Sequence, residues 1–121
     1  MNPENKKFLM EMINKFSVSV STLDDVVMYH MMLPNEQALT ICADTTMMGP
    51  NEATIYYTIY VGDNLLEEAV VETNNKKTID PVAKDIIQIM RLCSSKVMMQ
   101  EAHLAHTKFM VHEIANPKTY S

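Results

Sequence analysis

Two histidines near the C-terminus have a spacing that could serve metal binding. His103 and His106 are three residues apart, so they face the same side of a helix, and such a pair can hold zinc when a carboxylate joins it. The next acidic residue, Glu113, follows His106 by seven residues, about 10 Å further along a helix axis. It is too distant to complete the same site. The sequence therefore predicts no metal and no other cofactor, and the two histidines remain candidates for ligand binding.

Arg91 and a set of tyrosines are the other candidates for ligand binding. Arg91 is the single arginine, and a guanidinium group binds carboxylates and phosphates through paired hydrogen bonds. Tyr56 and Tyr60 share one face of the most strand-like segment, and with Tyr29 they could form an aromatic patch that stacks on bases. The alternative, which we favour, is that these rings pack under an oligomer partner or cover the sheet, and that Arg91 forms a surface ion pair.

The chain lacks a recognisable set of catalytic residues. Ser94 and Ser95 follow Cys93 without a GxSxG turn or an identifiable base. His30 stands alone in an apolar segment, where a structural role is the usual one. With only two glycines, the usual phosphate-binding loops are excluded. We therefore predict that the protein is not an enzyme and has no catalytic residues.

The hydrophobic pattern predicts one α+β domain over residues 1–121. Asn2 and Pro3 are typical of a helix start, and apolar residues then recur at helical spacing to about Phe16. Residues 17–21 alternate with period two and fit an extended segment. The turns between the predicted strands are short, which favours a four-stranded antiparallel meander. The strands are expected at residues 25–33, 38–45, 53–61 and 65–72, with the long C-terminal helix packed on the sheet.

Residues 80–115 are predicted to form one long helix. A break into two helices at Ser94 and Ser95 is the alternative, but a seven-residue apolar rhythm continues across that point. One apolar stripe, which we call the sheet-facing stripe, is expected to lie on the sheet. It comprises Ile79, Val82, Ala83, Ile86, Met90, Cys93, Val97, Leu104 and Val111.

A second apolar face of this helix predicts self-association. Its members are Ile87 and, at three- and four-residue steps, Met98, Ala102, Ala105 and Phe109, as helix packing requires. The predicted helix is longer than the width of a four-stranded sheet. The part that extends beyond the sheet must therefore pack against something else. The alternative is that the N-terminal helix covers this face. We expect a homo-oligomer formed through the C-terminal helix, with an undefined number of subunits.

Composition and charge exclude several classes of function. The chain has 121 residues, of which 47% are hydrophobic and 21% charged, as in a single globular domain. Its net charge of −5 and single arginine argue against double-stranded DNA as a ligand, because DNA-binding proteins present a basic face. Cys42 and Cys93 are far apart and indicate reduced thiols. The sequence shows no signal peptide and no run of roughly 20 apolar residues, so we expect a cytoplasmic protein that binds no membrane.

These observations predict a non-enzymatic binding or adaptor protein that sequesters or inhibits a partner protein. The chain contains 12 methionines, and methionine is adaptable and common at binding surfaces. The preference for lysine, asparagine, isoleucine and methionine fits an AT-rich genome and suggests an accessory protein of a phage or another mobile element. The alternative is a nucleotide sponge with a pocket between subunits. Its ligand-binding residues would be Arg91, His103, His106, Tyr56 and Tyr60.

Overall fold

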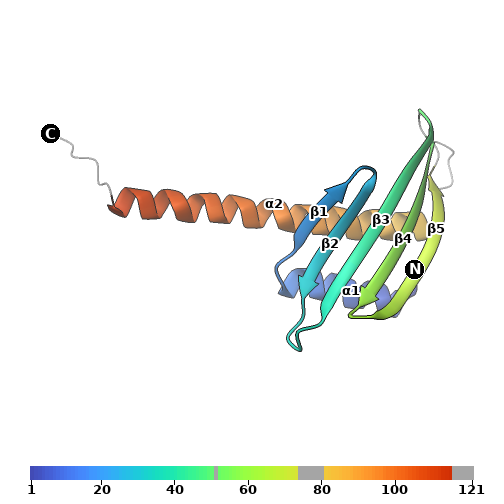
Figure 1. Ribbon diagram of the computed structural model, residues 1–121, viewed down its shortest axis with the longest axis horizontal. Helices are drawn as coiled ribbons and strands as arrows, with labels where there is room; N and C mark the ends of the chain where they lie inside the picture. Colours follow the sequence, from blue (N-terminus) through green and yellow to red (C-terminus); the bar gives the residue numbers. More distant parts are fainter. Residues whose placement is uncertain (51, 74–80, 116–121) are drawn as a thin grey trace.

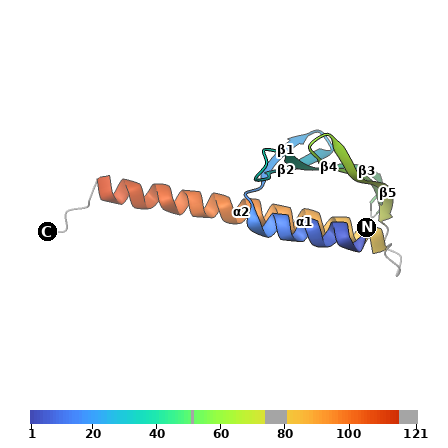
Figure 2. The same cartoon turned by 90° about the horizontal axis from the view of Figure 1, so that it is seen from below.

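The computed structural model describes residues 1–50, 52–73 and 81–115, without the side chains of 111–115. In these residues, two helices lie side by side on one face of a five-stranded sheet (Figures 1 and 2). The elements are α1 (Pro3–Lys15), β1 (Ser19–Leu23), β2 (Val26–Met32), β3 (Ala38–Gly49), β4 (Glu52–Val61), β5 (Asn64–Thr73) and α2 (Pro81–Ala115). The predicted α+β architecture, with a meander between two helices, is confirmed.

The sheet is an antiparallel meander in the order β1-β2-β3-β4-β5. The prediction of four strands is wrong, because the described residues also form β1, which pairs with β2 from Ser19↔His30 to Leu23↔Val26. The chain reverses at Asp24, which adopts a positive φ of 52°. Aspartate tolerates this left-handed conformation, so a tight turn forms without the glycine that usually marks one in a sequence.

The start of α1 has the capping geometry that its sequence indicates. The Asn2 side chain accepts hydrogen bonds from the backbone N–H groups of Glu4, at 2.8 Å, and Asn5, at 3.5 Å. These bonds satisfy donors that have no partner inside the helix. Leu9 and Ile13 are buried on the side of α1 that meets the core. Local capping and the apolar spacing together determine where α1 lies and how it is turned.

The core lies between the two helices and the inner face of the sheet, which is the face turned toward them. Alternate strand residues point inward, and their side chains meet α1 and α2. Fully buried side chains come from both layers and include Leu9, Leu39, Ile41, Tyr57, Ile59, Ile86 and Ile89. The same alternation leaves a second set of strand side chains on the opposite face.

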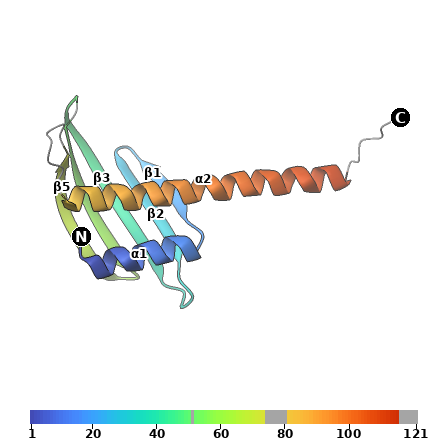
Figure 3. The same ribbon diagram turned by 180° about the vertical axis from the view of Figure 1, so that it is seen from behind.

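The long helix α2 is continuous, as predicted, but only its first half packs on the body of the domain (Figure 3). Ala83, Ile86 and Cys93 of the sheet-facing stripe are fully buried. Leu104 of that stripe is 53% exposed, so the prediction that the whole stripe lies on the sheet is wrong. The described sheet ends before the helix does. Ile79 and the side chain of Val111 lie outside the described residues.

Gln100 marks the point where α2 leaves the body. Its side-chain amide donates to the backbone carbonyl of Val18 and accepts from the backbone N–H of Val18, both at 2.7 Å. Beyond it, every residue from Glu101 to Met110 is exposed. We call residues 101–115 the projecting segment.

An ion pair joins the parallel helices α1 and α2 at their N-terminal ends. Asp85 lies 2.9 Å from the Lys6 ammonium group and 3.4 Å from the N-terminal ammonium group of Met1. The hydrogen bond from Lys6 is the main cause of the lowered pKa of Asp85. A lowered pKa in the folded state means that this carboxylate stabilises the fold above its usual pKa and loses that contribution when acid protonates it.

Replacing Asp85 with asparagine should therefore destabilise the protein by up to about 1 kcal/mol at neutral pH. The difference from the wild-type protein should shrink as the pH falls below 3.8, the usual pKa of this group. Urea unfolding at pH values from about 7 to 3 measures both effects. Glu11→Gln, at an exposed site on α1, is the matched control and should have little effect at any pH. An undiminished effect of Asp85→Asn in acid would contradict the prediction.

Candidate functional site

The face of the sheet turned away from the helices, here called the outer face, is covered by no helix of the described chain (Figure 2). A sheet face that meets water is usually polar. On this one, the register places Tyr60 beside Leu65 and Tyr56 beside Val70. The exposed large apolar and aromatic residues of the outer face are Leu23, Met32, Tyr56, Tyr60, Leu65 and Val70.

All formal charges of the sheet region are negative. Residues 16–75 contain nine aspartates and glutamates and no lysine or arginine. Three of the carboxylates belong to the outer face. Asp44 pairs with Tyr56, Glu68 with Thr58 and Glu72 with Thr54. The net charge alone does not show this segregation, but the positions of the lysines along the chain already reveal it.

Tyr56 and Tyr60 lie on the outer face, but Tyr29 does not join them. Tyr29 is 5% exposed on the inner face, and its hydroxyl forms a 2.6 Å hydrogen bond with the Ser94 hydroxyl of α2. The prediction of a patch of three tyrosines is therefore wrong at Tyr29, because Tyr29 lies opposite the buried Ile41. The Tyr56 hydroxyl donates a hydrogen bond to Glu68, which raises the pKa of Tyr56. This acidic setting disfavours a phosphate-bearing ligand beside the ring.

The second apolar face of α2 is exposed along the projecting segment. Met98 is 69% exposed and Phe109 58% exposed, and Ala102 and Ala105 between them are also exposed. The alternative that α1 covers this face is wrong. Polar contacts between α1 and α2 within the described residues include the Lys6–Asp85 pair and Lys96, whose ammonium group donates to the carbonyl of Asn14 at 3.1 Å.

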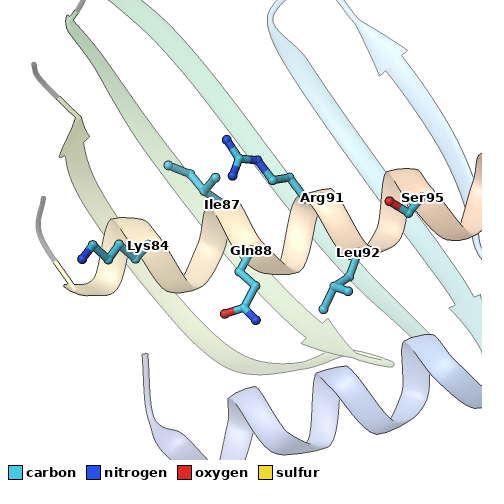
Figure 4. A pocket seen from close by; sticks show the side chains of 6 residues that line it. All are labelled: Lys84, Ile87, Gln88, Arg91, Leu92 and Ser95. Atoms are coloured by element: carbon cyan, nitrogen blue, oxygen red, sulfur yellow. The ribbon is translucent and has the colours of Figure 1, made fainter.

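A groove of about 510 Å³ lies between α2 and the inner face of the sheet. It is lined by Tyr29 and Ile55 of the sheet and by Ile87, Met90, Arg91, Ser94, Ser95 and Met98 of α2. Figure 4 shows Ile87 and Arg91 pointing to the side of α2 away from α1, whereas Gln88 and Leu92 point toward α1. Because Ile87 and Met98 belong to both, the groove and the second apolar face lie on the same side of α2.

Arg91 has no ion-pair partner among the described residues, since Asp85 pairs with Lys6.

The candidate ligand-binding residues do not share a site within one chain. Tyr56 and Tyr60 lie on the outer face, and Arg91 borders the groove on the other side of the sheet. His103 and His106 are exposed on the projecting segment. Among the described residues, no three histidine, cysteine or acidic side chains lie close enough together to hold a metal ion. The side chains of His112 and Glu113 lie outside this description.

Comparisons of this chain with protein-family models, curated proteins and solved structures gave no match. Within the described ranges, no helix combines the length and the apolar character needed to cross a membrane. The 35-residue α2 has sufficient length, but charged residues such as Lys84, Arg91 and Lys96 interrupt its apolar sequence.

Proposed function

We propose that this chain is a non-enzymatic binding protein that sequesters or inhibits a partner protein through its outer face. The observation that carries the proposal is a bare sheet face on which exposed apolar and aromatic side chains lie among carboxylates. Clustered apolar side chains on a surface are typical of interaction sites. Tyrosine is enriched at such sites because its ring buries a large apolar area while its hydroxyl stays hydrogen-bonded.

The charge of the outer face indicates the chemistry of the partner. A complementary protein would place lysine or arginine side chains near Asp44, Glu68 and Glu72 and apolar side chains against Tyr56 and Tyr60. Arginine can also stack on the tyrosine rings. The outer face of a second copy would carry the same negative charge and be repelled. Nucleotides and nucleic acids would be repelled from this face as well, so the setting of Tyr56 and Tyr60 favours a protein partner over a nucleotide there.

The test is to capture the partner from a lysate of the source cells, purify it and measure the affinity of the reconstituted pair. We expect the captured protein to present a basic surface and its affinity to fall as salt rises, because salt screens exposed charges. Glu72→Lys, at an exposed site on the outer face, should raise Kd by about tenfold or more, which corresponds to about 1.4 kcal/mol.

Glu11→Lys is the matched control, because it changes the net charge equally at an exposed site on α1. It should leave Kd nearly unchanged, since it lies on the opposite side of the sheet from the outer face. An equal loss of affinity in both variants would show that only net charge matters. That result, or a partner that binds without salt dependence, would contradict the proposed use of the outer face.

A further inference from the structure

We propose that the groove beside α2 receives the projecting segment of a second copy of this chain. In this arrangement the two α2 helices are antiparallel and cross near Met98, and Phe109 of each copy lies against Ile87 of the other. Each groove is then completed by a side chain that its own chain does not supply. The groove lies on the helix-covered side of the sheet, so this inference does not depend on the function proposed for the outer face.

A single stripe of α2, here called the groove-facing stripe, connects the groove with the projecting segment. Residues at steps of three and four share one side of a helix. Within the body, the stripe lines the groove through Ile87, Arg91, Ser94 and Met98. Beyond the body, it continues through Ala102, Ala105 and Phe109, all of which are exposed. The same side of one helix is thus a groove wall in its first half and a free apolar surface in its second.

The two halves of the groove-facing stripe have equal lengths. Met98 is eleven residues from Ile87 and eleven from Phe109, about 16 Å in each direction at the helical rise. A two-fold axis at Met98 therefore brings Phe109 of one copy level with Ile87 of the other. A two-fold interface is reciprocal, so both grooves are filled at once and the assembly closes as a dimer.

The side chains opposed in this register are compatible in size and charge. Arg91, the longest side chain of the stripe, is level with Ala105, and Ser94 is level with Ala102. Small residues at these levels allow two helices to approach closely. Among the described side chains of the projecting segment, Glu101 is level with Ser95 and Lys108 with Gln88. No like charges face each other at these levels.

The floor of the groove is suited to an apolar side chain such as Phe109 of a second copy. Tyr29 and Ile55 of the sheet are 5% and 6% exposed, and the Tyr29 hydroxyl already bonds to Ser94. The Tyr29 hydroxyl therefore needs no hydrogen bond from a side chain that enters the groove. Phe109 and Met98 are more than half exposed in the single chain. Burying their apolar area in the dimer would remove it from water and stabilise the dimer. The described charges of the projecting segment, Glu101 and Lys108, cancel, so two copies do not repel each other there.

Disulfide cross-linking tests the register in the full chain carrying Cys42→Ala. We expect Met98→Cys to form a cross-linked dimer on mild oxidation, because it lies at the two-fold axis. Ile87→Cys or Phe109→Cys alone should not, because the two equivalent residues would be about 33 Å apart along the axis and a disulfide needs Cα atoms within about 7 Å. A mixture of these two variants should cross-link. Cross-linking of Phe109→Cys with itself would overturn the antiparallel register.

Met99→Cys is the matched control for Met98→Cys, because both methionines are 69% exposed and adjacent residues point about 100° apart on a helix. It should cross-link far less. Light scattering of the wild-type protein should give twice the 13.8 kDa mass of the chain. A monomer at tens of micromolar, or equal cross-linking at the two methionines, would overturn the proposal.

Phe109→Lys tests the proposed anchor, because its ammonium group would enter a groove lined by the Arg91 guanidinium and be repelled there. We expect the dimer Kd to rise about a hundredfold or more while the circular dichroism spectrum is retained, since Phe109 is exposed in the single chain. Met99→Lys adds the same charge away from the groove-facing stripe and should leave the dimer intact. Loss of the helical signal in Phe109→Lys, or equal dissociation in both variants, would refute the arrangement.

Discussion

Replacing Ile86 with alanine is expected to lower the free energy of unfolding by about 2–5 kcal/mol. Ile86 is fully buried where the first half of α2 meets the core. The truncated side chain would leave a cavity that the surrounding sheet and helices can only partly close. Because a domain of this size is stable by about 5–15 kcal/mol, the change is a large fraction of the total. Chemical denaturation and a melting temperature lower by roughly 10 °C would both report it.

Leu104→Ala is the control for Ile86→Ala within the same sheet-facing stripe. Leu104 is 53% exposed on the projecting segment, so its truncation should change the free energy of unfolding by about 0.5 kcal/mol or less. Equal losses at Ile86 and Leu104 would contradict the exit of α2 from the body near Gln100.

Labelling of the native protein with a thiol reagent is expected to modify Cys42 and to spare Cys93. Cys93 is fully buried in α2, and burial raises the pKa of its thiol to about 12. At pH 8 only about one Cys93 in 10⁴ would be the reactive thiolate, and the surrounding core blocks the reagent as well. Cys42 is half-buried on the outer face, where reagent can approach. The difference in labelling rate should exceed about a thousandfold.

Mass spectrometry of labelled peptides distinguishes the two thiols. Both should react rapidly in guanidinium chloride, and Cys42→Ala should abolish rapid labelling of the native protein. Cys93→Ala should retain it. A partner bound to the outer face should slow the labelling of Cys42, which links this measurement to the proposed function. Rapid labelling of two thiols in the native wild-type protein would contradict the burial of Cys93.

The features that depend on neighbours along the chain follow from the residue pattern alone. The Asn2 cap and the apolar spacing after it locate α1, and the strand-like pattern of residues 53–61 locates β4 and places Tyr56 and Tyr60 on one face. The apolar rhythm across Ser94 and Ser95 predicted one continuous α2. Capping and periodicity are local properties, because each residue interacts with others only a few positions away. The turn at Asp24 was not predicted, because an aspartate in the sequence indicates a left-handed backbone conformation less clearly than a glycine does.

The packing of the elements in three dimensions determines what each of their faces meets. It turned Tyr29 inward, placed Tyr56 and Tyr60 beside carboxylates, and separated them from Arg91. It also left Leu104 exposed, although its place in the apolar rhythm matches that of the buried Ala83. Burial depends on two elements, not on one. The described sheet covers only part of a helix of 35 residues. Neither the width of the sheet nor the point where α2 leaves it follows from the apolar period of α2 alone.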